Sequence, residues 1–385
     1  MDVRAQTTAV RARPDRSRAV RLGTSLLAGF ALSLIATAVT SARTQVTEID
    51  FHVFYESARA WRSGTDLYAT AAAYPNLNPP HFVVAFAIFT WFSEHVAIEV
   101  WMALNLAAAL VAGAIVWTQL KLPRSFVPLT IGVAAAGLST GMLFGLEEGH
   151  PIGLFALCVT AAWAAHRQGR QAPSGLLLGL LVSVKPFFGC ILLVPLVRRE
   201  WRLIVCALAT ASAAAAAGVL LAGVPSVLRW VETGRQVSWF QHPLNASLAG
   251  LLARSGLGWL PWTVLVLALL TVTIAALRWS ASIDASWLAA GLASLLVSPL
   301  GWAYYLPLLA GPLAAITIRR PALLVAGLGF VWPVPFIMTL TSVEGLAAST
   351  ICSIMTWSLI AMWGVVVHAM LRPRPEDRVL EGQLS

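Results

Sequence analysis

Lys185 is one of only two lysines in this chain, and it stands beside Pro186 in an apolar stretch, SGLLLGLLVSVKPFFGCILLVPLV, at residues 174–197. An ionisable residue at membrane depth is costly, so it marks a candidate functional site. The lysine ammonium is a compact cation with three hydrogen-bond donors, which suits a phosphate group. Lys185 is therefore our first candidate for contact with an anionic ligand.

Arginines flank this stretch on both sides, and arginine gathers on the cytoplasmic side of membrane proteins. These flanking residues are Arg167, Arg170, Arg198, Arg199 and Arg202. The uncharged arms, 171–184 and 186–197, hold 14 and 12 residues, whereas a spanning helix needs about 20. We therefore expect a hairpin that enters the membrane and returns, with Lys185 at its tip facing a watery cavity.

Further polar side chains gather in segments that we place outside the cell. The first external loop, 43–99, carries Asp50, His52, Tyr55, Glu56, Asp66 and Tyr68; a short turn at 145–151 carries Glu147, Glu148 and His150; and a later loop carries His242, Asn245 and Arg254. A carboxylate that takes a proton from a hydroxyl, facing a cation that holds a departing phosphate, is the minimum apparatus for sugar transfer from a lipid phosphate. Such a donor needs no nucleotide-binding fold, and the sequence contains neither GxGxxG nor a P-loop.

The composition is that of a polytopic membrane protein: 385 residues, 58% hydrophobic, 11% charged, with a mean hydropathy of +0.77. Of the 26 Lys and Arg residues, 19 fall in segments that we place in the cytoplasm, so the net charge of +9 reflects topology and contact with membrane lipids. Nucleic-acid binding is not expected. The four cysteines and the histidines His52, His81 and His95 show no metal-ligand spacing, so we expect no metal.

The hydropathy and charge pattern predicts an all-α protein that forms a single integral-membrane domain, 1–385, with about eight full spans. We place these at 22–42, 100–120, 125–146, 151–166, 203–222, a segment ending at Arg278, 321–340 and 346–371. The first apolar run could instead be a signal peptide that is cleaved near 40–42. Its length favours a helix that is retained. The basic N-terminus, 1–21, and the tail, 372–385, are both expected in the cytoplasm.

Two further apolar segments are too short or too long for one crossing. The 12 residues at 81–92 are expected to dip into the membrane face, because a full crossing there would move the following arginines outside. The 34 uncharged residues between Asp284 and Arg319 are expected to form a second hairpin that turns at SPLGW, 298–302. The tips of the Lys185 hairpin and of this second hairpin would then both face the external side.

Several of these motifs resemble glycosyltransferase family 87, a family of polyprenol-phosphate-sugar-dependent enzymes of the GT-C fold. The resemblance is carried in order by DFHVFYESARAWRSGTDLY (50–68), NLNPPHFVVAF and VWMALNL, then by GLLLGLLVSVKPFFGCILLVPLVRREWR (175–202), HPLNASLAGLLARSG (242–256) and LLVSPLGWAYYLPLL (295–309). It implies a mannosyltransferase, or an arabinofuranosyltransferase, that modifies cell-envelope glycolipids or polysaccharides on the extracytoplasmic face. In one place the chain departs from the family pattern: GHPIG (149–153) stands where Gly-Gln-x-Asn is expected, with His150 in the position of the glutamine.

The resemblance also implies roles for single residues. Asp50 matches the first-loop aspartate and would be the catalytic base, and Lys185 would bind the donor phosphate. We add His242 and Arg254 to the expected phosphate-binding residues because they lie in the loop expected to face the acidic side chains. The residues left for an acceptor or sugar subsite are Tyr55, Glu147, Glu148, His150, Asn245, Trp302 and Tyr304. The expected partners are the lipid-linked donor, polyprenyl-phosphate-mannose, and a glycolipid or polysaccharide acceptor, with no cofactor besides.

Two alternatives remain at this point. A polyprenyl-phosphate-arabinose-dependent enzyme of the same family would carry the same motifs. A transporter or flippase of lipid-linked sugars would also use a buried lysine in a polar cavity. It would not need an acid in a long external loop, and it would usually show internal repeats, which the sequence lacks.

Overall fold

The computed structural model describes residues 49–121, 145, 148–258, 261–331 and 346–372. In this part of the chain the regular elements are α-helices and 3-10 helices, and the strand-like pairing is a single antiparallel bridge between Asn245 and Trp302. The all-α prediction is confirmed for these residues. The expected spans at 22–42 and 125–146, both terminal segments and Glu147 lie outside the described residues, as does much of 321–340.

Four helices in the described part are long and apolar enough to cross a membrane: α4 (Glu94–Gln119), α10 (Trp201–Gln236), α12 (Trp262–Trp279) and α18 (Ile354–Leu371). Their outward faces expose large aliphatic side chains, such as Leu220 at 83% and Leu110 at 67%, which only a lipid environment tolerates at this density. The chain is a membrane protein. The total of eight spans stays a prediction.

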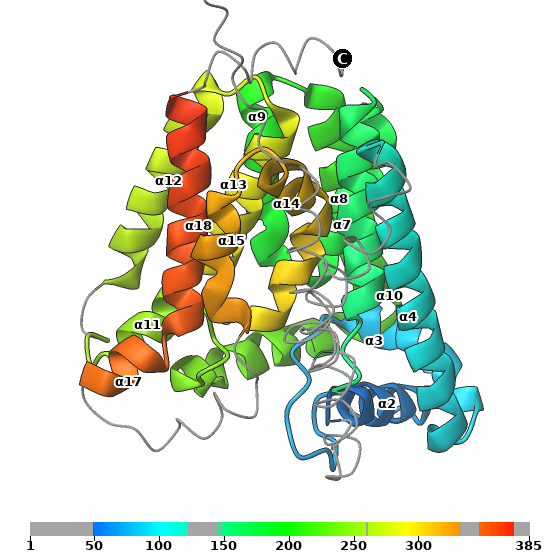
Figure 1. Cartoon of the computed structure of the whole chain (residues 1–385). Coiled ribbons are helices and arrows are strands. Elements are labelled where there is room, and N and C mark those ends of the chain that lie inside the picture. Colours follow the sequence, from blue (N-terminus) through cyan, green and yellow to red (C-terminus); the bar gives the residue numbers. More distant parts are fainter. Residues whose placement is uncertain (1–48, 122–144, 146–147, 259–260, 332–345, 373–385) are drawn as a thin grey trace, which may run out of the picture.

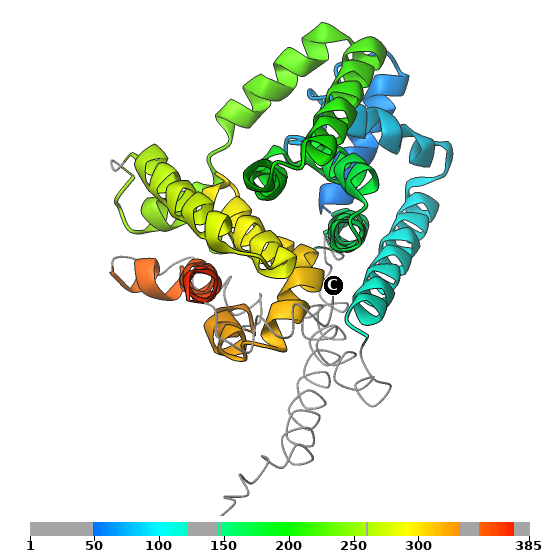
Figure 2. The ribbon, with the colours of Figure 1, turned by 90° about the horizontal axis from the view of Figure 1, so that it is seen from above.

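The helices run between two ends of the molecule (Figure 1). One end, here called the α2 end, carries α2 (Ile49–Arg62), α3 (Pro80–Phe86), α11 (Leu248–Arg254) and α17 (Leu346–Ile351). The opposite end, here called the α9 end, carries α9 (Leu193–Arg198) and the last turns of α12 and α18. Seen from above, α4 stands beside α7, and α12 and α18 lie on the far side of the molecule (Figure 2).

The Lys185 segment folds as two arms broken at the lysine. The arms are α8 (Gln171–Val184) and a return made of the 3-10 helix η4 (Pro186–Leu192) followed by α9. Lys185 itself has non-helical backbone angles (φ −127°, ψ 82°), and Pro186 opens η4. The entrance and exit of the hairpin meet, since His166 Nε2 lies 2.6 Å from Glu200 Oε2. Both ends of the hairpin therefore lie at the α9 end.

Close packing against α10 fixes the first arm of this hairpin. Gly175 and Gly179 of α8 face the backbone carbonyls of Leu203 and Ala207 in α10, and a Cβ at either glycine would overlap them. Small residues four apart let two helix backbones approach in this way. α8 is thereby held in register beside α10, which positions the lysine at its end.

The second expected hairpin consists of α13 (Ile283–Val297), the turn 298–302, the 3-10 helix η6 (Ala303–Leu309) and α14 (Ala310–Thr317). α13 is the centre of the hydrophobic core: every residue from Asp284 to Val297 is buried. Its first turn carries Asp284, which accepts from Trp163 Nε1 at 3.0 Å and lies 3.1 Å from Arg167 Nε. Because α7 (Ile152–Arg167) ends there, this hairpin also begins at the α9 end.

The segment at 81–92 is short helix, as expected. α3 and the 3-10 helix η1 (Ala87–Trp91) pack with α2 through an aromatic cluster at the α2 end. This cluster comprises Phe51, Phe54, Phe82, Phe86, Phe89 and Trp101, with ring centroids 4.9–5.6 Å apart in its edge-to-face pairs. The first loop is thus built on a small core of its own.

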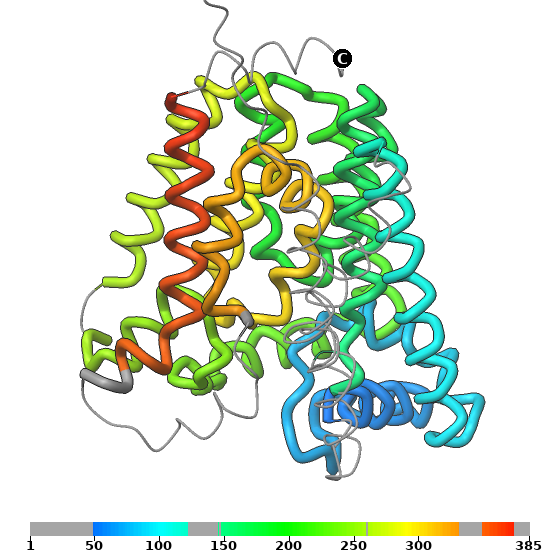
Figure 3. Tube along the Cα trace, viewed as in Figure 1, coloured from blue at the N-terminus to red at the C-terminus, as the bar shows by residue number. Residues whose placement is uncertain are grey.

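The structure differs from two expectations. The expected span 203–222 does end at a break, at Gly223 (φ +82°), but the segment after it, expected as a loop, is helical: α10 resumes with Pro225 in the new first turn and runs to Gln236. Gly-Val-Pro suggests the end of a helix, but proline also favours the first turn of a helix that restarts. The last expected span is divided into α17 and α18, and the tube in Figure 3 shows α18 rising from α17 toward the α9 end.

The remaining elements are short. The 3-10 helix η5 (Trp239–Gln241) and α11 lie between α10 and α12, and α15 (Ala322–Ala326) and the 3-10 helix η7 (Gly327–Val331) follow α14.

Candidate active site

Asp50 is held in place through the backbone of its own helix. The N–H groups of Asp50 and Phe51, in the first turn of α2, donate to the carbonyl oxygen of Glu148 at 2.9 and 3.2 Å. Free N–H groups at the start of a helix need such acceptors. The first loop and the turn at 148–151 are thereby joined, which brings Asp50 beside that turn.

Gly149 makes this contact possible. Its φ is +73°, a conformation that L side chains rarely adopt, and a Cβ there would overlap Phe51. The indole N–H of Trp101 donates to the Gly149 carbonyl at 2.7 Å. The buried amide oxygen of Asn105 accepts from the N–H of Gly153, at the start of α7, at 3.1 Å. Two side chains of α4 therefore hold the turn against α2.

The tip of the Lys185 hairpin meets the same turn through an aromatic contact. Lys185 Nζ lies 5.8 Å from the ring centroid of Tyr305, and the Tyr305 hydroxyl lies 3.2 Å from His150 Nε2. Phe187, two residues after the lysine, packs on Tyr305 with centroids 5.4 Å apart. The two hairpins and the 148–151 turn thus converge on one point.

The electrostatics tie Asp50 to this cluster. Desolvation by the surrounding protein raises the pKa of Asp50 to about 6, and the nearby Lys185 ammonium acts in the opposite direction. Burial, together with Lys185, holds the pKa of His150 well below its ordinary value, so this imidazole is neutral. A carboxylate with a pKa near neutrality is a suitable general base.

A row of aromatic rings borders the cluster. The rings of Trp302 and Tyr304 lie nearly parallel, with centroids 5.9 Å apart and an interplanar angle of 11°. His242 packs edge-on against Trp302 at 5.2 Å, and His150 lies 5.2 Å from Tyr304. Aromatic faces of this kind suit the apolar faces of sugars.

Asn245 links the loop that carries His242 to the turn of the second hairpin. Its amide nitrogen donates to the carbonyls of Phe240 and Pro299 at 3.2 and 3.0 Å, and its amide oxygen accepts from Gly301 N–H at 3.0 Å. The backbones of Leu244 and Ala303 add a further hydrogen bond of 2.9 Å. Trp302 is positioned by this pairing.

Arg254 is occupied by the protein itself. Its guanidinium donates to the carbonyls of His242 and Asn245 at 2.8 and 3.0 Å, and to the hydroxyls of Ser353 and Thr356 at 2.9 and 3.1 Å. A guanidinium has five N–H donors. Arg254 therefore fastens the loop before α11 to the start of α18, and little of its donor capacity is left for a ligand.

Comparison with known proteins gives the family. The model of glycosyltransferase family 87 matches residues 76–300, more than half of the chain. The chain belongs to glycosyltransferase family 87. It is 30% identical over 293 residues, 67% of each chain, to a polyprenol-phosphate-mannose-dependent alpha-(1-2)-phosphatidylinositol mannoside mannosyltransferase of Mycolicibacterium smegmatis. No solved structure is significantly similar to the chain.

Two further relatives come from Mycobacterium tuberculosis. A mannosyltransferase with the same description as the first is 28% identical over 312 residues, 73% of this chain and 72% of the relative. An alpha-(1->3)-arabinofuranosyltransferase is 27% identical over 164 residues, 41% of this chain and 38% of the relative. The chain is a glycosyltransferase.

The family 87 match contains Lys185, His242 and Arg254, whereas Asp50 precedes it and Tyr304 follows it. The structure nevertheless brings Asp50, Lys185, His150 and Tyr304 into one cluster. Tyr55 points elsewhere: its hydroxyl donates to the Phe92 carbonyl at 2.8 Å within the first loop. Glu147 lies outside the described residues. In the described segments, no group of three His, Cys, Asp or Glu side chains is arranged to hold a metal ion.

Four residues that build the site of this family 87 chain were not predicted from its sequence. Tyr305 and Phe187 looked like ordinary neighbours of Tyr304 and Lys185, and Trp101 and Asn105 like parts of an apolar span. Asn105 is the one that left a signal, because an amide in the middle of an apolar helix needs a polar partner. Here that partner is the start of α7.

Proposed function

We propose that this protein is an inverting mannosyltransferase that transfers mannose from polyprenyl-phosphate-mannose to a cell-envelope glycolipid or polysaccharide. Support for the donor comes from the two mannosyltransferase relatives, which resemble the chain over about two thirds of its length or more. Family 87 membership supports a GT-C-type arrangement. The arabinofuranosyltransferase relative matches a shorter segment at lower identity, so a polyprenyl-phosphate-arabinose donor is the second candidate.

The observation that carries the proposal is the approach of a carboxylate and a cation from different loops. Asp50, in the first loop, is bonded through its backbone to the 148–151 turn, and Lys185, at the hairpin tip, meets the same turn through Tyr305 and His150. The Lys185 ammonium accordingly opposes the rise in the pKa of Asp50. Direct sugar transfer needs a proton acceptor on one side of the anomeric carbon and a cation on the other. These two groups supply that pair.

In the proposed step, the Asp50 carboxylate takes the proton of an acceptor hydroxyl. The hydroxyl oxygen forms a bond to the anomeric carbon of the sugar, and the bond from that carbon to the phosphate oxygen breaks. Its electron pair leaves with polyprenyl phosphate, whose growing negative charge faces Lys185 and His242. Attack opposite to the leaving group inverts the anomeric centre.

The sugar would lie over Trp302 and Tyr304. His150 is buried, and its Nδ1 has no hydrogen-bond partner in the described part of the protein, while its Nε2 meets Tyr305. A buried nitrogen of this kind is costly unless a ligand or water meets it. We assign it to a sugar hydroxyl, together with the carboxyl group of Glu148 at the edge of the turn.

The proposal places the site on the extracytoplasmic face and both termini in the cytoplasm. The arginine-rich turns that include Arg167, Arg198 and Arg319 meet at the α9 end, where their side chains surround Asp284 and Glu200. The Asp50 cluster belongs to the opposite half of the molecule. The positive-inside rule supports the cytoplasmic assignment of the α9 end.

The test is transfer by purified protein. The protein is incubated with labelled polyprenyl-phosphate-mannose and a phosphatidylinositol mannoside acceptor, and in parallel with labelled polyprenyl-phosphate-arabinose. Label from mannose in the glycolipid is the expected result, with chelator present because the proposal includes no metal. Transfer from arabinose alone would select the second candidate, and movement of lipid-linked sugar between leaflets without transfer would establish a transporter.

A further inference from the structure

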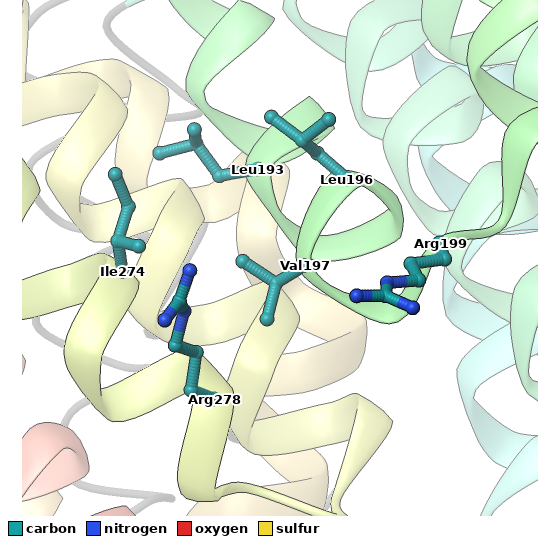
Figure 4. Close-up of a pocket in the computed structure, with 6 residues that line it drawn as sticks. All are labelled: Leu193, Leu196, Val197, Arg199, Ile274 and Arg278. Carbon is teal, nitrogen blue, oxygen red and sulfur yellow. The ribbon is translucent and has the colours of Figure 1, made fainter.

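The α9 end carries a groove that the proposed reaction does not use. It lies between α9 and α12, has a volume of about 340 Å³, and is lined by Leu193, Leu196, Val197, Arg199, Ile274 and Arg278 (Figure 4). Four of these side chains are aliphatic and two are cationic. Its volume is at the lower end of the range of small-ligand sites.

The two arginines are free to bind a ligand. Neither guanidinium has a hydrogen-bond or ion-pair partner in the part of the chain that the structure describes, and both side chains are exposed. Two other arginines of this end are paired: Arg198 with Glu200 at 3.2 Å and Arg167 with Asp284 at 3.1 Å. Carboxylates therefore neutralise the neighbouring arginines and leave the groove positive.

Neither arginine uses its side chain at its own helix terminus; Arg199 ends α9 through its backbone N–H. The guanidinium of Arg278 is directed back along α12 toward Ile274 and Leu193 (Figure 4), away from the carbonyls that end the helix. Arg199 caps the short α9 with φ +60°, a left-handed position where glycine is the usual residue. The chain keeps an arginine there, beside the apolar wall.

Two exposed tryptophans indicate the level of the groove in the membrane. Trp279, next to Arg278, is 77% exposed, and Trp201, at the start of α10, is 58% exposed. Exposed tryptophans of membrane proteins mark the level of the lipid headgroups. The arginines therefore lie at the level of the lipid phosphates, while Leu193, Val197 and Ile274 face the acyl chains.

We propose that this groove binds an anionic phospholipid, with its phosphate between Arg199 and Arg278 and an acyl chain along the aliphatic wall. The paired N–H donors of an arginine match the oxygens of a phosphate group. Contact with neutral lipid alone would not require two arginines. A soluble phosphate compound would gain nothing from the four aliphatic side chains. The site is separate from the Asp50 cluster and does not depend on the reaction proposed above.

The experiment measures lipid binding by the full-length protein in detergent, with phosphatidylglycerol as the probe and phosphatidylcholine as the zwitterionic comparison. Native mass spectrometry counts the lipids that stay bound. The double variant Arg199→Gln/Arg278→Gln should bind phosphatidylglycerol at least about 10-fold more weakly. The control Arg170→Gln/Arg202→Gln removes the same charge from exposed arginines of the same end and should bind as the parent does.

A second variant keeps both arginines and tests the groove itself. Leu196, which is 47% exposed, is replaced by glutamate, and the added carboxylate should repel the phosphate and weaken binding to a similar degree. Equal binding by the parent and both groove variants, or an equal loss in the control, would overturn the proposal. Equal affinity for glycerol 3-phosphate, the headgroup without chains, would make this a free-phosphate site and overturn the lipid assignment.

Discussion

The backbone N–H of Asp50 donates a 2.9 Å hydrogen bond to the carbonyl oxygen of Glu148. This bond fixes the acid of the first loop beside the turn that carries His150, and it is possible only because Gly149 leaves space for Phe51. The position of the proposed base therefore depends on a glycine, which has no side chain to take part in the chemistry.

Replacing Gly149 with alanine should lower transfer by about 100-fold or more, because a shift of about 1 Å in a reacting group is enough for such a loss. The control is Gly64→Ala. Gly64 has nearly the same φ, +72°, but no neighbouring atom within 4 Å of an added Cβ. Both variants carry the backbone strain, and only Gly149→Ala displaces α2. Equal activities of the two variants would show that the position of α2 does not matter.

Replacing Lys185 with methionine removes the charge and keeps an apolar stem of similar length. A charge-assisted contact with phosphate is worth about 1.5–3 kcal/mol, so the donor should bind about 10- to 150-fold more weakly. The rate of transfer at saturating donor should fall as well, because the leaving phosphate carries more charge in the transition state. Titration calorimetry with the donor and single-turnover rates separate the two effects. A variant unchanged in both would make Lys185 structural.

The pH dependence of kcat/KM should show an acid limb near pH 6. The base must be ionised, and desolvation raises the pKa of Asp50 to about 6, so activity should be lost as the pH falls through that value. Because Lys185 acts to lower the pKa of Asp50, Lys185→Met should move the acid limb to higher pH. Movement to lower pH, or a limb that stays in place, would contradict the proximity of the two groups.

Arg254→Gln should destabilise the protein by about 2–4 kcal/mol, since it breaks several buried hydrogen bonds and leaves carbonyls without donors. Thermal unfolding in detergent measures this, with the exposed Arg235→Gln as the matched charge control. Donor affinity should change little in the fraction that stays folded. Parent-like unfolding together with donor binding weakened 10-fold or more would instead assign Arg254 to the donor phosphate.

The all-α class and the break at Lys185 could be predicted because charge and hydropathy constrain a membrane chain strongly, whereas Asp50 was proposed from its place in a motif that resembles family 87. The arginines around 171–197 and the shortness of its two arms predict a break at Lys185, and the structure has a break there. Helix 224–236 was missed because Gly223 and Pro225 look like a helix end, although the same two residues permit a restart.

The role of Arg254 depends on contacts that sequence spacing does not contain. An arginine in a polar loop suggests a phosphate ligand, whereas its four acceptors come from the loop before it and from Ser353 and Thr356, far along the chain. Asn245 is similar: its amide joins the backbone at Phe240 to that of the turn 298–302, so its role is positional. Side-chain partners of this range become visible only in the folded molecule.

The most direct measurement is sugar transfer by Asp50→Asn together with donor binding by the same protein. An amide keeps the shape of the carboxylate but cannot accept the proton of the acceptor, so the rate should fall about 10²- to 10⁴-fold. Donor affinity should stay close to that of the parent, because Lys185 and His242 are unchanged. A folded Asp50→Asn protein that transfers mannose at the parent rate would contradict the assignment of Asp50 as the base.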